Sequence, residues 1–301
     1  MRITALSGGV GGARMLRGLA TVEGIDLTAI VNVGDDDIIY GLNLSPDLDT
    51  VTYTLASVHS DERGWGRTDE SWNVMDELAG FPLDSTFRLG DRDLALNLYR
   101  TTRLDEGATL SAVTVEISKV FGIGSEVLPV SDDPIRTKVL VDGEWLDFQD
   151  YFVRRRHAVP VSDVRFAYVA EARPAPGVIE ALSECEAVVI GPSNPILSIW
   201  PILAVPGIRE TMAGKRVMAV SPLVGGDAIK GPLADLLPAF GYPTDTTGII
   251  ASYGDLLTDI VVHHGDAPDD PVVPAVHETN TLIADPSAAA RLASEMISWL
   301  T

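Results

Sequence analysis

The sequence has little cysteine, few basic residues and no long apolar run. Cys185 is the single cysteine in 301 residues, so neither an internal disulfide nor a cysteine metal cluster can form. A reducing cytoplasm is therefore the expected location. Lys and Arg number 22 against 43 Asp and Glu, which excludes the basic surface that nucleic acid or an anionic membrane requires. No apolar run reaches membrane-spanning length, and a small anionic substrate would need only a local positive pocket.

A glycine-rich loop near the N-terminus lacks the signatures of two common nucleotide-binding motifs. SGGVGGAR at 7–14 has neither the Gly-Lys-Ser/Thr ending of a P-loop nor the third glycine of the dinucleotide fingerprint. Glycines still let backbone N–H groups approach a phosphate, and the following helix offers its positive end. A strand-to-helix turn without ligand is the alternative. The residues predicted to bind phosphate here are Ser7, Gly8, Gly9, Val10, Gly11, Gly12 and Arg14.

Short apolar strands alternate with helical segments along most of the chain. The expected strands are 3–6, 27–33, 166–169, 187–191, 216–221 and 259–266, and the expected helices are 13–22, 50–58, 69–78, 91–103, 109–120 and the C-terminal stretch. Asp142-Gly143 marks the turn of a hairpin over 137–148. This order predicts an α/β fold: a Rossmann-like, mostly parallel sheet with helices on both faces. We expect one domain, 1–301, with its core at about 1–58 and 160–301 and an inserted helical and hairpin region at about 60–160.

Two further loops are expected at the ligand-binding edge of such a sheet. In GPSNP (191–195) two prolines fix the backbone around Ser193 and Asn194, which could present polar groups to a phosphate or a base. NVGDDD (32–37) could hold the ribose of NAD, which leaves an NAD-dependent oxidoreductase as an alternative. The simpler interpretation of Asp35–Asp37 is a solvated turn.

SPDLDTVTYTL (45–55) carries the acids best suited to a metal. In an extended segment Asp47 and Asp49 would point to the same side, and two carboxylates plus substrate phosphates are a typical Mg²⁺ arrangement. The alternative is that Asp49 only caps a helix beginning at Thr50. The next acid, Asp61, opens DERGWGRTDE, where Trp65 could stack on a flat ring or lie in the core.

These motifs, taken together and in order, resemble one family. SGGVGGAR, VNVGDD, SPDLDTVTYTL, RGWGRTDESWN, LGDRDLA and GPSNP are similar to the 2-phospho-L-lactate transferase (CofD/FbiA) family of deazaflavin coenzyme biosynthesis, over nearly the whole chain. A related family of YvcK-like regulatory proteins, which bind UDP-sugars, shares the glycine loop and remains an alternative. The RGWGRTDESWN and LGDRD stretches favour the transferase.

The resemblance implies a specific phosphoryl transfer. The terminal ribityl hydroxyl of the deazaflavin Fo (7,8-didemethyl-8-hydroxy-5-deazariboflavin) would attack the phosphorus that bears a three-carbon acid, and GMP would leave. The donor would be enolpyruvyl- or lactyl-diphospho-guanosine, and RGWGRTDESWN resembles the actinobacterial form that uses the enolpyruvyl donor. The product is then dehydro coenzyme F-420-0. Fo, the donor and GDP or GMP are the expected partners, and a homodimer is the expected assembly.

The resemblance also implies roles for individual residues. Asp49 and Arg88 match the acceptor-binding positions of the family, and we expect Trp65 beside them. Mg²⁺ is the expected cofactor, on Asp47, Asp49 or Asp61, and Asp49 and Asp61 are the expected catalytic residues. The glycine loop, with Ser193 and Asn194, would hold the diphosphate.

Overall fold

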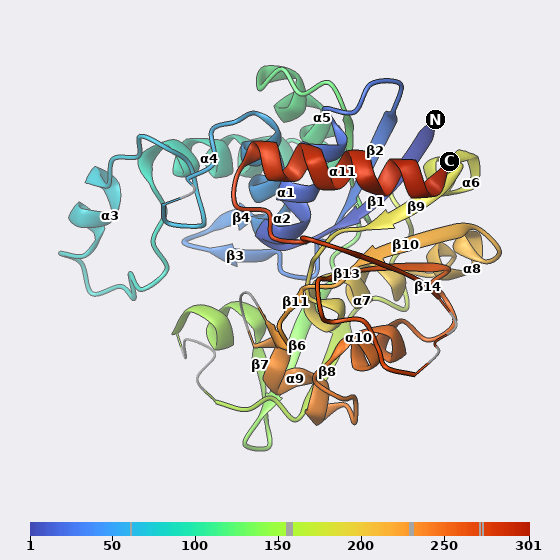
Figure 1. The fold of residues 1–301 in the computed structure, drawn as a ribbon. Coiled ribbons are helices and arrows are strands. Elements are labelled where there is room, and N and C mark those ends of the chain that lie inside the picture. The colour runs from blue at the N-terminus through green and yellow to red at the C-terminus, as the bar shows by residue number, and fades with distance from the viewer. Residues whose placement is uncertain (61, 155–158, 229–231, 271, 273) are drawn as a thin grey trace.

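A computed structural model describes residues 1–60, 62–154, 159–228, 232–270, 272 and 274–301. In this part of the chain seven strands form the central sheet, and every pairing between them is parallel (Figure 1). From one edge to the other the strands are β14 (Ala275–Thr279), β13 (Asp259–His263), β10 (Arg216–Val220), β9 (Ala187–Ile190), β1 (Arg2–Ser7), β2 (Asp26–Val31) and β5 (Glu126–Pro129). The predicted Rossmann-like architecture is confirmed.

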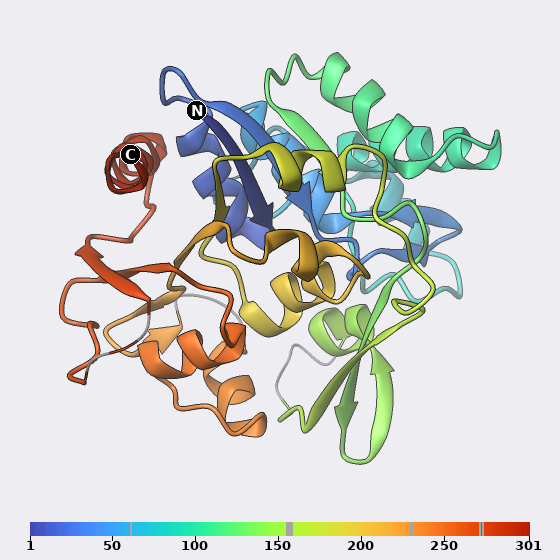
Figure 2. The ribbon, with the colours of Figure 1, turned by 90° about the vertical axis from the view of Figure 1, so that its right-hand side faces the viewer.

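The central strands are apolar along almost their whole length because both faces of the sheet are covered. β9 is buried at all four positions, and β1 at every position after Arg2. Figure 2 shows α1 (Gly9–Leu19) and α11 (Pro286–Leu300) on one side of the sheet and α6 (Val178–Glu184) on the other. Helices on both faces are therefore confirmed as well.

The remaining elements flank this core. The other helices are α2 (Pro46–Leu55), α3 (Asn73–Leu78), α4 (Asp91–Asp105), α5 (Leu110–Val120), α7 (Trp200–Leu203), α8 (Ile208–Met212), α9 (Leu233–Ala239) and α10 (Thr246–Tyr253), with π-helical turns η1 (Asp150–Arg154) and η2 (Pro195–Ile199). The small antiparallel sheets are β3 (Asp37–Ile39) with β4 (Leu42–Leu44), β11 (Leu223–Val224) with β12 (Asp227–Ala228), and β7 (Glu144–Asp147) with β6 (Arg136–Val141) and β8 (Asp163–Ala167). No helix in the described part of the chain is long and apolar enough to cross a membrane.

Several sequence-based boundaries were wrong, for identifiable reasons. Helix α2 begins at Pro46 and not at Thr50, because proline suits the first position of a helix. The strand expected at 166–169 belongs to β8, which pairs antiparallel with β6 outside the central sheet. β5 and β14 were missed; both are short edge strands, and β5 lies inside the stretch expected to be an insertion.

A buried carboxylate ties the last helix to the sheet. Asp259, on β13, accepts hydrogen bonds from Arg216, His277 and Thr258, and Arg216 also donates to the carbonyls of Trp299 and Leu300 at the end of α11. Burial raises the pKa of Asp259, but the hydrogen bonds from Arg216, His277 and Thr258 outweigh it and lower the pKa to about 2.

We expect Asp259→Asn to lower the free energy of unfolding by about 2 kcal/mol, since Arg216 and His277 lose a buried counter-charge. The native pKa lies below the unfolded value of about 4, so this contribution is complete above that pH and is lost as the pH falls toward 2. Urea unfolding at several pH values measures both effects. Asp255→Asn is the control, because that side chain is 99% exposed; equal losses in the two variants would contradict the assignment.

Candidate active site

A cavity opens at the point in the sheet where the strand order reverses. From β1 the chain proceeds to β2 and β5 on one side, whereas β9 and the later strands lie on the other. A crevice forms at such a switch point, between the loops that follow the two neighbouring strands. Here these are the glycine loop after β1 and residues 191–195 after β9, and they line one end of a cavity of about 660 Å³.

The two loops touch through their backbones, which accounts for most of the glycines. A Cβ atom added to Gly11 would lie 2.2 Å from the carbonyl oxygen of Pro192, and one added to Gly191 would lie 2.9 Å from the Cα of Gly12. Ser193 joins the loops by donating its hydroxyl to the Gly8 carbonyl at 2.7 Å. This close approach leaves no room for side chains at the junction.

The structure divides the predicted phosphate-binding residues into two groups. The group that lines the cavity comprises Gly8, Gly9, Val10, Gly11, Ser193 and Asn194. Asp47 accepts the Gly9 N–H, and the other N–H groups in the first turn of α1 have no acceptor within the helix, so the turn can offer those to an anion. Ser7 and Gly12 lie beneath the loop, where a Cβ on Gly12 would be 2.5 Å from the hydroxyls of Ser7 and Ser193. Arg14 extends to the carbonyl of Ile283 and is not among the described lining residues.

Asp47 and Asp49 both line the cavity but accept hydrogen bonds from different partners. They lie in the first turn of α2 and not in an extended segment, so their carboxylates do not share one side, and Asp49 is not the N-cap. Asp47 accepts the N–H of Gly9 at 2.7 Å and the amide of Asn32 at 2.9 Å. Asp49 is held by both terminal nitrogens of the buried Arg100.

A cluster of buried carboxylates surrounds this end of the cavity. Burial raises the pKa of Asp36 to about 8, of Asp93 to about 7 and of Asp47 to about 6, and it also raises the pKa of Asp49. Burial raises the pKa of Asp35 well above its ordinary value, and the neighbouring charges of Asp47 and Asp36 raise it further. One oxygen of Asp35 is buried without a hydrogen-bond partner. Burial therefore disfavours the ionised forms of these carboxylates, and a bound cation would favour them.

Sequence reasoning missed Asp35 as a site residue. Its loop was left open between a ribose-binding acid and a solvated turn, and Asp35 is 9% exposed and lines the cavity. The available signal was position, since Asp35 follows a buried strand at the edge where ligands bind. Asp93, Arg100 and Tyr53 were also missed, because helix α4 brings Asp93 and Arg100 to the site from a distant segment.

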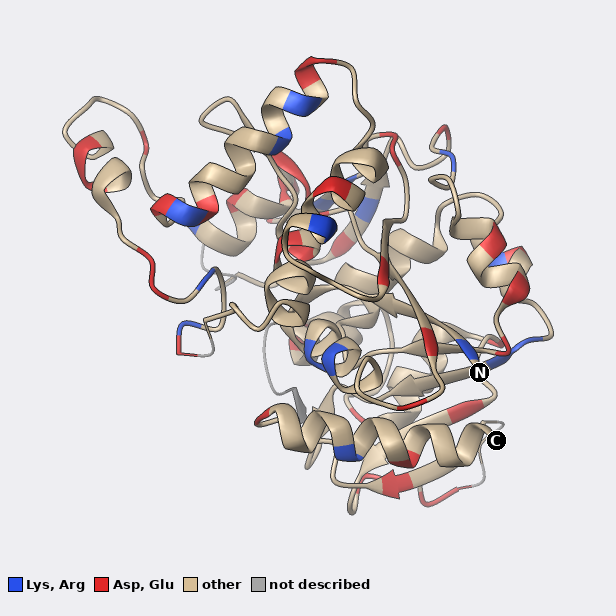
Figure 3. Cartoon of the chain, turned by 90° about the horizontal axis from the view of Figure 1, so that it is seen from above, with Lys and Arg blue, Asp and Glu red and all other residues tan. Residues whose placement is uncertain are grey.

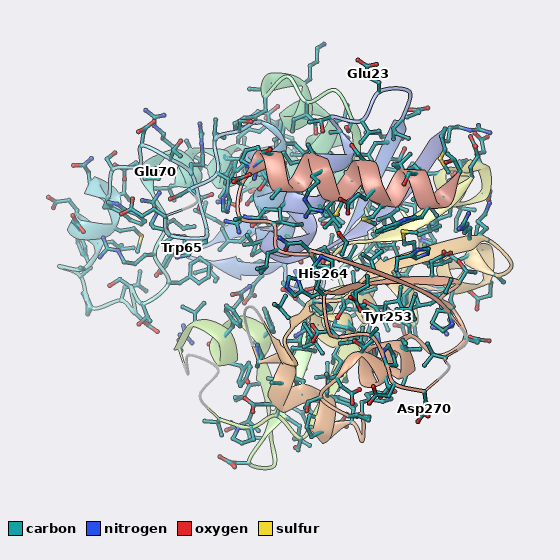
Figure 4. All side chains as sticks on the ribbon, in the orientation of Figure 1. Glu23, Trp65, Glu70, Tyr253, His264 and Asp270 are labelled. Carbon is teal, nitrogen blue, oxygen red and sulfur yellow. The ribbon has the colours of Figure 1, made fainter. Side chains whose placement is uncertain are left out.

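The opposite end of the cavity is aromatic and apolar. Trp65 and Arg88 come from the segment before α4, and Phe148 and Phe152 come from the region of η1, where their rings stack at 5.4 Å. Figure 4 labels Trp65 on the lobe that carries α3, away from the helices of the core. Arg88 is the one Lys or Arg side chain among the described lining residues. Asp61, predicted to be catalytic and to bind metal, lies outside the described residues.

The surface agrees with the strongly acidic composition. Figure 3 shows Asp and Glu distributed over the helices and loops of the viewed side, with Lys and Arg fewer and interspersed. Since Arg88 is the one basic side chain in the described lining, the cavity offers little positive charge to attract an anion over long distances. An anionic ligand would be held by backbone N–H groups, by Arg88 or by a bound cation.

A parallel sheet with a glycine loop and a cavity at its switch point defines a doubly wound α/β protein whose candidate ligand site lies at that point. Comparison with known sequences gives the family. The family model described as "2-phospho-L-lactate transferase CofD" matches residues 3–297, and the chain belongs to this family of transferases. The expected membership is thus confirmed, and the transferase replaces the NAD-dependent and YvcK-like alternatives.

Curated relatives include both donor types of the family. The phosphoenolpyruvate transferase of Streptomyces griseus is 44% identical over 267 residues, covering 86% of this chain and 84% of the relative. The 2-phospho-L-lactate transferase of Methanocaldococcus jannaschii is 39% identical, covering 99% of this chain and 97% of the relative. Among solved structures, a UPF0052 family protein of Bacillus halodurans superposes with a TM-score of 0.64 at 19% identity, covering 98% of each chain, which supports the fold.

The loop junction makes a prediction about stability. We expect Gly11→Ala to lower the free energy of unfolding by about 1–3 kcal/mol, because its methyl group would overlap the Pro192 carbonyl. Gly9→Ala is the matched variant: its Cβ meets nothing within 4 Å, and only the strain at φ +64° applies, about 1–2 kcal/mol. Denaturant unfolding measures the free energy of unfolding of both variants, and titration with GDP measures their affinity for GDP. We expect Gly9→Ala to keep its fold and lose GDP affinity; full stability in Gly11→Ala would refute the packing role.

Proposed function

We propose that the protein transfers a phosphoenolpyruvyl group from enolpyruvyl-diphospho-guanosine to the terminal ribityl hydroxyl of Fo. The hydroxyl oxygen forms a bond to the phosphorus that carries the three-carbon acid, and the bond from this phosphorus to the oxygen of GMP breaks. The hydroxyl proton is lost, GMP leaves, and dehydro coenzyme F-420-0 is the product. With a lactyl donor the same chemistry would give coenzyme F-420-0.

The observation that carries this proposal is the continuity of the cavity. One end has the backbone N–H groups of the glycine loop and residues 191–195, which suit a diphosphate. The other end has Trp65, Phe148 and Phe152, which suit a flat ring, with Arg88 beside them. Phosphoryl transfer depends mainly on positioning and charge neutralisation, so a cavity that holds both substrates in line supplies much of what the reaction needs.

The choice of donor rests on motifs and relatives. RGWGRTDESWN resembles the actinobacterial form, and the Streptomyces relatives at 43–44% identity are named phosphoenolpyruvate transferases. Archaeal relatives named 2-phospho-L-lactate transferases reach 39% identity over nearly the whole chain. These figures favour the enolpyruvyl donor and keep the lactyl donor as the alternative.

The acidic end of the cavity fits Mg²⁺. Among the described residues no three His, Cys, Asp or Glu side chains form a closed metal site. Mg²⁺ commonly uses only one or two carboxylates and completes its shell with substrate phosphates and water. Asp47 and Asp35, with its unpaired buried oxygen, would hold the ion, and the ion would withdraw charge from the diphosphate. We retain Asp61 and Asp49 in the proposed metal and catalytic set, although Arg100 already neutralises Asp49.

The remaining residues would position the substrates. Asp49 lies between the two ends of the cavity and would accept a hydrogen bond from the ribityl chain of Fo while Arg100 holds it in place. Arg88 and Trp65 would bind the ring system. Ser193 and Asn194 would support the donor diphosphate, since Ser193 fixes the glycine loop and the Asn194 side chain caps η2.

Incubating the purified protein with Fo, Mg²⁺ and each synthetic donor, followed by mass spectrometry, tests the proposal. We expect the mass of dehydro coenzyme F-420-0 and an equal amount of GMP with the enolpyruvyl donor, and slower turnover with the lactyl donor. Faster transfer from the lactyl donor would reverse the choice of donor. Absence of both products, with Fo and GDP bound, would overturn the function.

Replacing one carboxylate should separate metal binding from stability. Asp35→Asn removes a charge that burial, Asp47 and Asp36 all disfavour, so we expect its Tm without Mg²⁺ to equal or exceed the wild-type value. Turnover should fall at least about a hundredfold, as after loss of one electrostatic element of the transition state. Mg²⁺ with GDP should raise the Tm of the wild type but not of the variant. A variant with normal activity, or a wild type indifferent to EDTA, would contradict the metal site.

A further inference from the structure

The stretches RGWGRTDESWN and LGDRDLA carry acids whose role the cavity does not explain. Glu70 and Asp91 are absent from its described lining, yet they flank the segment 71–90, which supplies Arg88 and also Trp72, whose ring lies 5.9 Å from that of Trp65. Glu70 precedes α3, and Asp91 is the first residue of α4. Figure 4 labels Glu70 and Trp65 on the same lobe, at the end of the molecule where α3 and α4 lie.

Asp91 binds the start of the neighbouring helix. Its carboxylate accepts the N–H groups of Asn73 and Val74, both at 3.1 Å, and these are the first two residues of α3. It also accepts the Ser71 hydroxyl at 2.6 Å and the Asn73 side-chain amide at 2.8 Å. Hydrogen bonds from Ser71, Val74 and Asn73 lower the pKa of Asp91 to about 2, so the side chain stays ionised at neutral pH.

Glu70 binds the start of α4 in return. Its two oxygens accept the N–H groups of Arg92 at 2.8 Å and Asp93 at 2.9 Å. The carboxylate lies so close to the backbone that a Cβ atom on Gly90 would be 2.2 Å from the Glu70 Cδ. Each acid therefore satisfies amide groups at the start of the other segment's helix, where negative charge is favourable.

This reciprocal pair, here called the carboxylate clamp (Glu70 and Asp91), is attached directly to the aromatic end of the cavity. Gly90 and Asp91 follow Arg88 and Leu89, which line the cavity, and Asp93 lines it as well. A further hydrogen bond holds the same segment: the Tyr40 hydroxyl donates to the Phe87 carbonyl at 2.7 Å. The clamp fixes both ends of the segment from Ser71 to Gly90, while Phe81 and Leu83 within it are 65% and 50% exposed. Met75 in this segment is buried, so core packing holds only part of the segment in place.

We propose that Glu70 and Asp91 are positioning residues for the acceptor: the clamp sets the wall formed by Trp65 and Arg88 to receive the ring of Fo. The inference rests on the proposed function for the identity of the acceptor. The clamp lies away from the glycine loop, so its loss should weaken acceptor binding and leave the donor end unchanged. Because few core residues belong to this lobe, global stability should change little.

The variants Glu70→Gln and Asp91→Asn keep the shape of each side chain but leave one helix amide without a carboxylate acceptor. Glu77→Gln is the matched control, since it removes an exposed acid on α3 at a position outside the clamp. The readouts are the Kd values of Fo and of GDP by calorimetry, the acceptor KM, Tm, and hydrogen exchange of the amides of Asn73, Val74, Arg92 and Asp93. Amide exchange reports clamp opening without any need for activity.

We expect each clamp variant to weaken Fo binding about tenfold, with a matching rise in acceptor KM, faster exchange at its own pair of amides, and GDP affinity within about twofold. The control should match the wild type in all of these. Unchanged Fo affinity despite faster exchange would overturn the clamp's role, as would an equal loss of Fo and GDP affinity with a large fall in Tm. A wild type that binds Fo without transfer would refute the proposed function while the comparison of Kd values still tests the clamp. A wild type that binds no Fo would overturn both.

Discussion

The contact between the backbones of two loops is the constraint on which the site depends. Gly11 lies against the Pro192 carbonyl and Gly12 against Gly191, and this is possible only because β1 and β9 are neighbours in a parallel sheet. The contact brings the start of α1 to the same point as residues 191–195, and α2 follows through the bond from Asp47 to the Gly9 N–H. Donor-side groups from three separate segments thus share one anchor, and a side chain at the junction would displace all three.

The second feature of the site is a group of buried carboxylates beside the cavity. Arg100 forms an ion pair with Asp49, whereas burial raises the pKa values of Asp35, Asp36 and Asp47 and so favours their protonated forms. Under the proposed function, a cation bound beside these side chains would favour their ionised forms and would reduce their repulsion of a diphosphate. The donor would then be held by backbone N–H groups and a shared metal, with little contribution from basic side chains.

The sequence predicted the features that depend on periodicity and local composition, and it failed where tertiary contacts decide. The alternating apolar strands and the positions of the glycine and GPSNP loops follow from burial and turn chemistry, and both were confirmed. The partners of Asp47 and Asp49 could not be predicted, because Pro46 starts the helix early and Arg100 arrives from α4. Arg14 lies outside the described cavity lining for a similar reason: its position on α1 directs it toward the Ile283 carbonyl.

The two ends of the cavity differ in how firmly they are built, and the reaction gives a reason. The donor end is made from buried strands and backbone contacts, which suits a diphosphate whose phosphorus must be positioned about 3–3.5 Å from the attacking oxygen. The acceptor end is made from an exposed lobe fixed by charge-assisted hydrogen bonds at its two ends. Such bonds can open locally without disturbing the sheet, so a bulky ring could enter or leave while the donor stays in place. Under the proposed function, this difference predicts ordered binding, with the donor first and the acceptor second.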